Sequence, residues 1–522
     1  MRRVPLLVVG VLVLVHQVDH LLRGDVSGWP FAGEVTWFTA SLLLYPALLA
    51  GLLLLGRRRW VQVALAVLLV GTVQVPHMFW ETPADQYGTW AHGVSWTPAA
   101  PERPNLLGIS SPALGVVSVT VAVALSLAVP VGLVLLAGDL PRFRRPGRVA
   151  AAALLVLVLG VDLFYGWAWT SPDHSRLART IVWQESDVSD YRRFPARPVP
   201  SRPPVFRFRR SAAADQLPVA TVPVRQGGRL VERDLEGFLR STGTTAFLAI
   251  KGDTLVSEVY FRGYGHDATV SSFSVAKPVV SALVGIAIAQ GRIGSVDDPV
   301  SRYLPELGRR DPRFGHITLR HLLTVTSGLA DLDPYYDLDL RTVALWHTRI
   351  VEPPGRRFRH NNVNPVLLGM VLERVTGATV SAYLSEWFWG PLGMEADGSR
   401  SLDSRRSGLE LLQAGLNGRA VDFAKLGALY LHRGAWRGRQ LVPRRWVADS
   451  TRADTRTDPS PAFQYDWWTR PGTGPPNDFW AKGNHGQFVY VAPGRDVVLV
   501  RFGIDYNYDH WPELLAALAR RL

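Results

Sequence analysis

The chain has 522 residues, which is too long for one ordinary domain and predicts two or three folded units. It contains no cysteine, so disulfides, thiolate metal sites and a cysteine nucleophile are excluded. Its formal net charge is +13, but the arginines lie mainly in short loops beside apolar segments and in one linker. That distribution argues against nucleic acid as a partner.

The first third of the chain carries the long apolar runs. Five of them are each roughly 20 residues long, which is enough to cross a bilayer as a helix. They span residues 4–22, 36–55, 60–79, 112–137 and 149–169. The first run lacks a small-residue cleavage site, so it does not read as a signal peptide.

The arginines between these runs predict an orientation. Basic groups precede the first run and separate the second from the third and the fourth from the fifth, at 2–3, 57–59 and 142–148. The alternate loops, 23–35 and 80–111, carry few basic residues. By the positive-inside rule, the N-terminus is cytoplasmic and everything after about residue 170 is extracytoplasmic. The sequence thus predicts a multi-pass protein of the cell membrane.

A few polar residues fall near membrane depth: His16, Asp19, His20, His77, Glu81 and Asp162. His16 and His20 share a helical face at i, i+4, a spacing that can bind a metal. The same spacing suits interfacial residues that bond to each other and to water. A carboxylate such as Asp162 inside a bilayer is costly and is usually paired or functional. No motif assigns these residues a function.

Residues 171–235 form a polar connector rich in proline and arginine, with Phe194 to Pro204 at its centre. Such a segment is expected to run extended over the next domain, and its charge also suits contact with lipid headgroups. We therefore divide the chain into a membrane domain at 1–170, a connector at 171–235 and a water-soluble domain at 236–522.

The soluble domain begins and ends with predicted strand pairs. Strands are expected at 244–250 and 254–261 around a Gly-Asp turn, and at 488–492 and 497–502 across Pro-Gly-Arg-Asp. A last helix is expected at 512–522, and the middle is largely helical. This order predicts an α+β domain, an antiparallel sheet flanked by helices with an all-helical insertion, after an α-helical transmembrane bundle.

Ser274 and Lys277 stand at i, i+3 before the apolar run 279–289. If that run is helical, hydroxyl and amine lie on one face within reach of each other. A serine becomes a good nucleophile when a nearby base takes its proton, and a lysine of lowered pKa can be that base. Lysine occurs only at 251, 277, 425 and 482, and arginine supplies the other basic residues. Because arginine cannot be deprotonated at useful pH, a base here has to be lysine.

Several segments, in order, resemble the serine β-lactamase and penicillin-binding-protein superfamily, and most of all its class C branch of esterases, D-amino-acid peptidases and nylon-oligomer hydrolases. The resemblance covers about 240–522. It is carried by Ser-Ser-Phe-Ser-Val-Ala-Lys at 271–277, the segments 317–329, 354–377 and 417–427, and Gly-Asn-His-Gly-Gln at 483–487.

The resemblance implies a β-lactamase/transpeptidase-like fold and a set of roles. Ser274 would attack a carbonyl and form an acyl-enzyme, with Lys277 as its proton partner. Backbone amides of Ser274 and of the strand near Gly486 would form the oxyanion hole, at about 3 kcal/mol per donor. Water would then release the acyl group, and the mechanism requires no metal or organic cofactor.

The second motif departs from the family pattern. Where the family has Tyr-x-Asn, this chain has His360-Asn361-Asn362. Histidine can exchange protons near neutral pH, so His360 is a candidate catalytic residue. The alternatives are an inactive site, or a tyrosine supplied by Tyr335 or Tyr336. Asn362 is expected to bond the substrate amide or Lys277.

The third motif also departs. In place of Lys-Thr-Gly or His-x-Gly the chain has Ala-Lys-Gly-Asn-His-Gly-Gln at 481–487. His485 and Gly486, with Gln487, are the favoured substrate-binding and oxyanion residues, and Lys482 is the alternative. Without Lys-Thr-Gly, recognition of a β-lactam carboxylate is in doubt, which favours an esterase, amidase or peptidase.

The other family segments are interpreted as mainly structural. His321 and the segment 326–328 are expected to cap and turn helices, and Asp422 and Lys425 to form a local ion pair. Asn417 is placed at the edge of the site.

The leading functional interpretation is a membrane-anchored extracytoplasmic serine hydrolase acting on an amide, an ester or a D-amino-acid peptide. Its partners would be a small-molecule or peptide substrate and the lipid bilayer. Two alternatives remain open, a penicillin-binding receptor that is acylated on Ser274 and a catalytically inactive binding module. Turnover separates the first interpretation from the other two.

Overall fold

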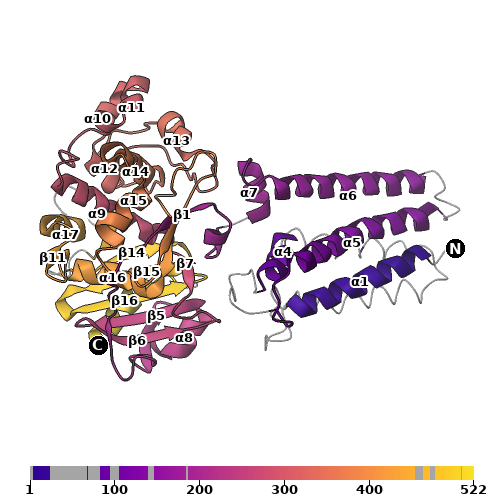
Figure 1. The fold of residues 1–522 in the computed structure, drawn as a ribbon, viewed down its shortest axis with the longest axis horizontal. Helices are drawn as coiled ribbons and strands as arrows, with labels where there is room; N and C mark the ends of the chain where they lie inside the picture. Colours follow the sequence, from indigo (N-terminus) through magenta and orange to yellow (C-terminus); the bar gives the residue numbers. More distant parts are fainter. Residues whose placement is uncertain are drawn as a thin grey trace. The chain divides into compact units, whose positions relative to one another are not determined.

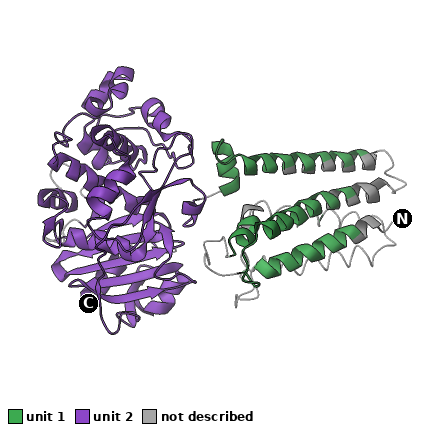
Figure 2. Ribbon diagram, viewed as in Figure 1, with its two compact units in different colours: residues 1–185 green, residues 186–522 purple. Residues whose placement is uncertain are grey.

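The computed structural model describes residues 4–23, 68, 83–93, 105–138, 146–183, 186–452, 462–470, 477–506 and 508–522. These residues fall into two compact units, unit 1 at residues 1–185 and unit 2 at residues 186–522 (Figure 2). The division lies inside the segment that the sequence assigns to a connector.

Unit 1 is helical. Its described helices are α1 (Val4–Arg23), α4 (Pro83–His92), α5 (Pro112–Gly138), α6 (Pro146–Thr170) and α7 (Arg176–Trp183). The long helix α5 packs against α1, α4 and α6 (Figure 1). Among the described residues, no helix combines the length and the apolar character that a membrane crossing needs. The apolar runs at 36–55 and 60–79 lie outside the described residues.

A buried polar cluster joins three helices of unit 1. The Nε2 atoms of His16 and His20 are 3.0 Å apart, so these two side chains hydrogen-bond to each other. This bond agrees with the second interpretation of their spacing, in which the two residues bond to each other. The Asp19 carboxylate accepts hydrogen bonds from Trp90 Nε1 at 2.8 Å, Ser118 Oγ at 2.6 Å and Arg23 Nε at 2.8 Å. Because α1, α4 and α5 each contribute a partner, the cluster ties these helices together.

No cluster of three potential metal ligands occurs in the described parts of the chain. His77 and Glu81 lie outside those parts, and Asp162 falls within α6 but its side chain is not described.

Unit 2 begins with residues 186–235, which are most of the predicted connector. Strand β1 (Ala196–Val199) pairs with β8 (Gly398–Ser401), and β2 (Arg209–Arg210) runs parallel to β6 (Thr254–Tyr260). Strands β3 (Thr221–Gln226) and β4 (Arg229–Asp234) form a hairpin. This proline-rich segment therefore contributes strands to unit 2.

The main sheet of unit 2 has the strand order β12-β13-β14-β15-β16-β5-β6-β2. Its members not yet named are β5 (Thr244–Lys251), β12 (Phe463–Gln464), β13 (Trp467–Thr469), β14 (Phe479–Gly483), β15 (Gln487–Ala492) and β16 (Val497–Gly503). The two strand pairs predicted from the sequence are confirmed. They meet in the centre of the sheet, where β16 pairs antiparallel with β5.

Helices cover both faces of this sheet. On one face, α16 (Ala420–Leu431) packs so closely that a Cβ on Gly427 would lie 2.5 Å from Val498 Cγ1. On the other face, α18 (Trp511–Arg521) buries Trp511, Leu514 and Leu518 against strand residues such as Tyr490. Burial of each such apolar side chain contributes about 1.5–3 kcal/mol to folding, so both helices stabilise the sheet.

The helical part of unit 2 is centred on α9 (Ala276–Ala289), which packs against α14 (Val363–Thr376). Helix α14 in turn packs against α12 (Leu319–Leu323) (Figure 1). A 3-10 turn at Phe273–Val275 enters α9 and also contacts β14. The described part of unit 2 thus has an α+β fold, with the Ser274 turn where the sheet and the helices meet.

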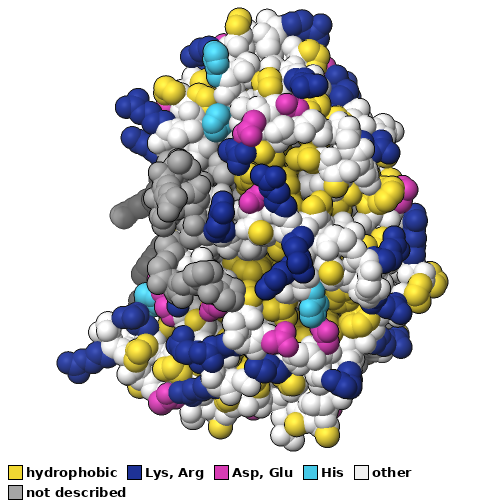
Figure 3. All heavy atoms as spheres, turned by 90° about the vertical axis from the view of Figure 1, so that its left-hand side faces the viewer, with side chains coloured by type: hydrophobic (Ala, Val, Ile, Leu, Met, Phe, Trp, Pro, Cys, Tyr) yellow, Lys and Arg dark blue, Asp and Glu magenta, His cyan; other side chains and the backbone are white. Residues whose placement is uncertain are grey.

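Figure 3 shows one face of unit 2. Outside the grey atoms, the arginine and lysine side chains are dispersed among hydrophobic and neutral ones. On this face the positive charge of the chain is spread out and forms no continuous basic surface.

Candidate active site

Ser274 sits on a constrained turn between a strand and a helix. Strand β7 (Thr269–Ser271) pairs with β9 (Leu416–Arg419), and the Ser272 N–H donates to Leu416 O at 3.0 Å. Phe273 then has a φ of +47°, which is costly for a residue with a side chain and is typical of functional sites. Phe273 and Val275 are buried, whereas Ser274 is only half-buried. The turn therefore presents the hydroxyl to solvent from a rigid frame.

Lys277 is the second residue of α9 and is 6% exposed. Its Nζ donates to Ser274 Oγ at 2.8 Å and to Asn362 Oδ1 at 2.9 Å, and it lies 3.5 Å from His360 Nε2. The structure therefore brings four predicted site residues together from two chain segments. Within the described residues, no carboxylate forms an ion pair with Lys277.

The environment of Lys277 favours its neutral amine. Burial lowers the pKa of Lys277 to about 8, and the opposing charges of Asp466 and Asp333 do not cancel that effect. A lysine with such a pKa is partly uncharged near pH 8, and its lone pair can then accept the proton of Ser274. The geometry suits a nucleophile and its general base.

His360 lies where the family has its tyrosine. Desolvation, followed by the charge of Lys277, lowers the pKa of His360 to about 4, although Asp331 and Asp333 act in the opposite direction. The imidazole is thus neutral at neutral pH, with one ring nitrogen near the lysine. A neutral imidazole can pass a proton to or from Lys277 without adding positive charge to the site.

The two alternative tyrosines have other surroundings. The Tyr335 hydroxyl donates to Asp190 Oδ2 at 2.7 Å. Burial, and then the charge of Asp190, raises the pKa of Tyr335 well above its usual value. The Tyr336 ring lies 5.1 Å from the Tyr335 ring and 6.3 Å from the Phe194 ring. Of the three candidates for the tyrosine role, His360 is the one that the structure places beside Lys277.

The third-motif residues lie on the β14–β15 hairpin, but their side chains have other partners. His485 packs on Phe273 with ring centroids 5.1 Å apart, and its Nε2 and Nδ1 lie 2.6 Å from Ser186 O and 3.1 Å from Ile504 O. Gln487 is buried and bonds both the N–H and the carbonyl of Gly503. These side chains fix the hairpin and are not turned towards Lys277.

Gly483 and Gly486 differ in what they approach. A Cβ on Gly483 would lie 2.4 Å from Ser272 O, so the end of β14 packs directly against the nucleophile turn. A Cβ on Gly486 would instead lie 2.1 Å from Arg501 Nη1. Lys482, the alternative third-motif residue, is exposed and lies 5.1 Å from the centre of the Tyr506 ring. Gly483 is the glycine of this motif nearest the turn, which makes its strand end the better candidate for the second oxyanion amide.

Arg501 was not among the site residues predicted from the sequence. It is fully buried in β16, and its guanidinium donates to Gly486 O at 2.7 Å, Asp505 O at 3.0 Å and Thr242 O at 2.5 Å. It thereby holds the β14–β15 hairpin in place. An arginine within the apolar run Val-Val-Leu-Val-Arg-Phe was the available signal, because a buried charge must find partners.

The remaining predicted residues are structural. Thr318 and His321 form a capping box at the start of α12, as expected. Lys425 Nζ lies 3.1 Å from Asp422 Oδ1, which confirms the predicted ion pair. Asn417 is buried, accepts from Ser271 Oγ at 3.0 Å and so braces the strand that precedes the nucleophile turn.

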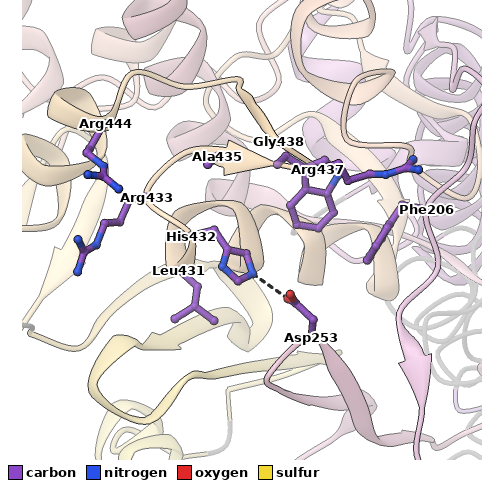
Figure 4. Close-up of a pocket in the computed structure, with 10 residues that line it drawn as sticks. Phe206, Asp253, Leu431, His432, Arg433, Ala435, Arg437, Gly438 and Arg444 are labelled. Carbon is purple, nitrogen blue, oxygen red and sulfur yellow. Dashed lines mark hydrogen bonds and ion pairs between the residues drawn. The ribbon is translucent and has the colours of Figure 1, made fainter.

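A groove of about 540 Å³ lies elsewhere on unit 2 (Figure 4). It is lined by the end of α16 and the following segment, with His432 Nε2 bonded to Asp253 Oδ1 at 2.7 Å. Its arginines are Arg433, Arg437 and Arg444. None of the residues around Ser274 lines this groove, so it is separate from the candidate active site.

Comparisons with known proteins agree with this geometry. The profile of the beta-lactamase family matches residues 231–504. The 6-aminohexanoate-dimer hydrolase of Paenarthrobacter ureafaciens is 27% identical over 389 residues, covering 67% of this chain and 91% of that enzyme. Esterase EstB of Burkholderia gladioli is 30% identical over 200 residues, covering 32% of this chain and 49% of that esterase.

One solved structure supports the fold. It is a Bacillus anthracis protein whose assignment as a 6-aminohexanoate-dimer hydrolase is provisional, with a TM-score of 0.54 at 22% identity, covering 63% of this chain and 89% of that one. The matched family segment contains the Ser274 turn, Lys277 and Asn362. The chain therefore belongs to the beta-lactamase family and is a serine hydrolase of that family.

Proposed function

We propose that the protein hydrolyses small linear amides or esters through an acyl-enzyme on Ser274, and that it does so outside the cytoplasmic membrane in which its N-terminal region is anchored. The observation that carries the chemical part is the contact of Lys277 Nζ with both Ser274 Oγ and Asn362 Oδ1, at 2.8 and 2.9 Å, without an ion pair in the described residues. A buried amine with those neighbours is a base for the serine.

The reaction has two halves. In the first, Ser274 Oγ bonds to the substrate carbonyl carbon while its proton moves to the amine of Lys277. In the proposed mechanism, backbone amides at the Ser274 turn and at the end of β14 stabilise the oxyanion. The proton on Lys277 then passes to the departing amine or alcohol, directly or through His360, as the carbon–nitrogen or carbon–oxygen bond breaks.

In the second half, water attacks the acyl carbon. Lys277 or His360 takes a proton from that water, and Ser274 Oγ regains one as the ester bond to the enzyme breaks. Asn362 orients Lys277 in both halves.

Two considerations support amides and esters over β-lactams. The printed names of the two relatives describe a hydrolase of an amino-acid dimer and an esterase. The hairpin at 481–487 lacks the Lys-Thr-Gly pattern that would recognise a β-lactam carboxylate. Peptides ending in D-amino acids belong to the same chemical class and stay within the proposal.

The membrane part of the proposal rests on the sequence. Its support is the set of apolar runs in the first 170 residues and the arginine bias of the loops at 2–3, 57–59 and 142–148. It predicts that alkaline carbonate does not extract the protein from cell membranes. It also predicts that protease added to intact spheroplasts degrades unit 2. Extraction by carbonate, or protection from protease, would contradict it.

The chemical part is tested on the full chain in detergent. A fluorophosphonate probe should add one adduct to Ser274, and the Ser274→Ala variant should add none. Nitrophenyl esters and the 6-aminohexanoate dimer should be turned over, and benzylpenicillin should leave no long-lived adduct. A stable penicillin adduct without turnover would favour a receptor, and no adduct from a folded sample would indicate a binding module.

A further inference from the structure

Asp466 is a buried carboxylate beside the active site that the proposed mechanism has not used. It follows Tyr465 in the two-residue turn between β12 and β13. Both residues have positive φ values, +42° for Tyr465 and +68° for Asp466. A hairpin turn of this kind favours Asn-Gly, because side chains are disfavoured in that conformation. The turn therefore keeps two residues in a strained conformation, as functional sites often do.

Helix α12 holds this turn from one side. The Asp466 N–H donates to Leu323 O at 3.1 Å, and Arg320 Nη1 donates to the Tyr465 hydroxyl at 2.7 Å. Arg320 is itself paired with Asp297 at 2.7 Å. The turn is thus fixed by backbone and side-chain bonds to a single short helix.

The strand register places the turn at the active-site end of the sheet. Trp468 pairs with Trp480 in β14 and Thr469 pairs with Phe479. Because β13 and β14 are antiparallel, the turn that precedes β13 lies towards the end of β14, the strand end that packs against the nucleophile turn. Residues far apart in the sequence therefore bring this carboxylate near Lys277.

The carboxylate itself has no hydrogen-bond partner among the described residues. Asp466 is 3% exposed, and both of its carboxylate oxygens are buried without a donor. Such a group is costly to bury unless a positive charge faces it. The charge that acts on it is that of Lys277.

The titratable groups around the pair come from several elements. Lys277 on α9 is opposed by Asp466 and by the exposed Asp333, and His360 lies on its other side. Tyr430 on α16 is also buried near Asp466. Burial raises the pKa of Asp466 and the charge of Lys277 lowers it, while Asp466 in turn raises the pKa of Lys277.

We infer that Asp466 is a positioning residue for the reaction, a buried carboxylate whose negative charge acts on Lys277 and sets the balance between its amine and its ammonium form. The inference rests on the proposed acyl-enzyme chemistry. When Ser274 attacks, its O–H bond breaks, the Oγ–carbon bond forms and Lys277 gains a proton. The new ammonium then faces the carboxylate, which stabilises it as charge develops.

This role has two opposite consequences for an Asp466→Asn variant. Without the negative charge, Lys277 loses its proton more readily, so the acid limb of the pH–rate profile should move to lower pH by about one pH unit or more. The ammonium formed during attack also loses its partner, so the plateau rate at high pH should fall by about tenfold or more. Substitution of a residue that only supports the fold would change the stability and leave the midpoint of the acid limb at the same pH.

The test measures the rate of Ser274 labelling by a fluorophosphonate probe from pH 5 to pH 10, on the full chain in detergent. The matched control is Asp333→Asn, which removes an exposed carboxylate and should move the limb much less because water screens its charge. Asp466→Ser serves the same purpose as Asp466→Asn if the asparagine variant does not fold, and melting curves verify folding of each variant.

The outcomes separate the two proposals. A limb that moves to lower pH in Asp466→Asn, but not in Asp333→Asn, supports the inference. Wild-type labelling together with an unchanged limb in a folded Asp466 variant overturns the inference and leaves the proposed function standing. Absence of labelling in the wild type overturns the proposed function, and the inference falls with it.

Discussion

Two buried lysines of unit 2 show how the same residue type serves different purposes. Lys425 on α16 is fully buried, lies 3.1 Å from Asp422 and 3.7 Å from Glu395, and donates to Gly393 O at 3.0 Å. Lys277 on α9 is nearly as buried, but it contacts a hydroxyl, an amide oxygen and an imidazole. Both stand three residues after a polar partner, Asp422 within α16 and Ser274 in the 3-10 turn that enters α9.

The difference lies in how the charge is compensated. A direct carboxylate stabilises the ammonium of Lys425 in the interior and makes it part of the fold. Burial lowers the pKa of Lys425 as well, although Asp422 and Glu395 at short distance oppose that effect. Lys277 has only neutral neighbours at contact distance, and burial lowers its pKa to about 8. A buried lysine without an ion pair is thus a candidate general base, whereas a buried lysine paired with a carboxylate stabilises the fold. The following predictions test this comparison.

The largest expected effect is on catalysis at Lys277. Lys277→Arg keeps the positive charge but cannot release a proton, so kcat/KM should fall by on the order of 1,000-fold. Hydrolysis of a nitrophenyl ester measures the effect. Lys425→Arg is the matched control, because the ion pair of Lys425 needs a positive charge but no release of a proton. Comparable losses in the two variants would break the comparison.

The next effect is on stability at Lys425. Lys425→Met leaves Asp422 buried without its cation and should lower the free energy of unfolding by about 3–5 kcal/mol. The labelling rate per folded molecule should stay near the wild-type value. Chemical denaturation measures the first quantity and probe labelling the second, and a stable variant would show that the ion pair is dispensable. The double variant Asp422→Asn, Lys425→Met should recover part of the loss.

The pH dependence of the wild type comes third. Because Lys277 must be deprotonated and its pKa is lowered to about 8, kcat/KM should rise with pH and level off above about pH 8. At pH 6 it should be about 100-fold below the plateau. The pKa of His360, lowered to about 4, adds no limb between pH 5 and pH 8. A profile that is flat from pH 6 to pH 9 would show that Lys277 is not the base.

A smaller effect is expected at His360. Replacing it with glutamine removes a proton carrier but no charge, so kcat/KM should fall by about 10- to 100-fold while the midpoint of the acid limb stays in place. Steady-state kinetics across the same pH range provide the measurement. His360→Tyr, which restores the residue type of the family, should recover more activity than the glutamine variant. Full activity in the glutamine variant would remove His360 from the mechanism.

The smallest effect is expected in the groove of Figure 4, which shares no lining residue with the site around Ser274. Arg444 is exposed there, and Arg444→Ala should change the free energy of unfolding by less than about 0.5 kcal/mol and leave hydrolysis unchanged. Thermal melts and ester hydrolysis measure both quantities. A large loss of activity would connect this groove to the site.

Much of the fold and part of the site could be predicted from the sequence. Local patterns located the central strands, since alternating β-branched residues between Gly-Asp and Pro-Gly turns favour hairpins. Helical spacing predicted the Ser274–Lys277 contact and the Asp422–Lys425 pair, because residues three apart share a face. Both predictions concern neighbours in the chain, where the backbone alone brings the side chains together.

The tertiary structure decided what depends on distant segments. It placed His360 beside Lys277, in the role for which two tyrosines were also candidates. The hydroxyl of one of them, Tyr335, donates a hydrogen bond to Asp190 instead. It showed that His485 and Gln487 brace a hairpin that Arg501 fixes from β16. No spacing rule reaches such contacts, because they depend on how whole elements pack.

The sequence by itself therefore determined that this chain carries a serine nucleophile with a lysine one helical turn away, within an ordered set of family segments. Only the tertiary structure decided that the lysine is buried without an ion pair and that the carboxylate of Asp466 is buried in a strained turn at the same end of the sheet. The physical reason is that a pKa is set by all the groups within a few ångströms, and most of those groups come from distant parts of the chain.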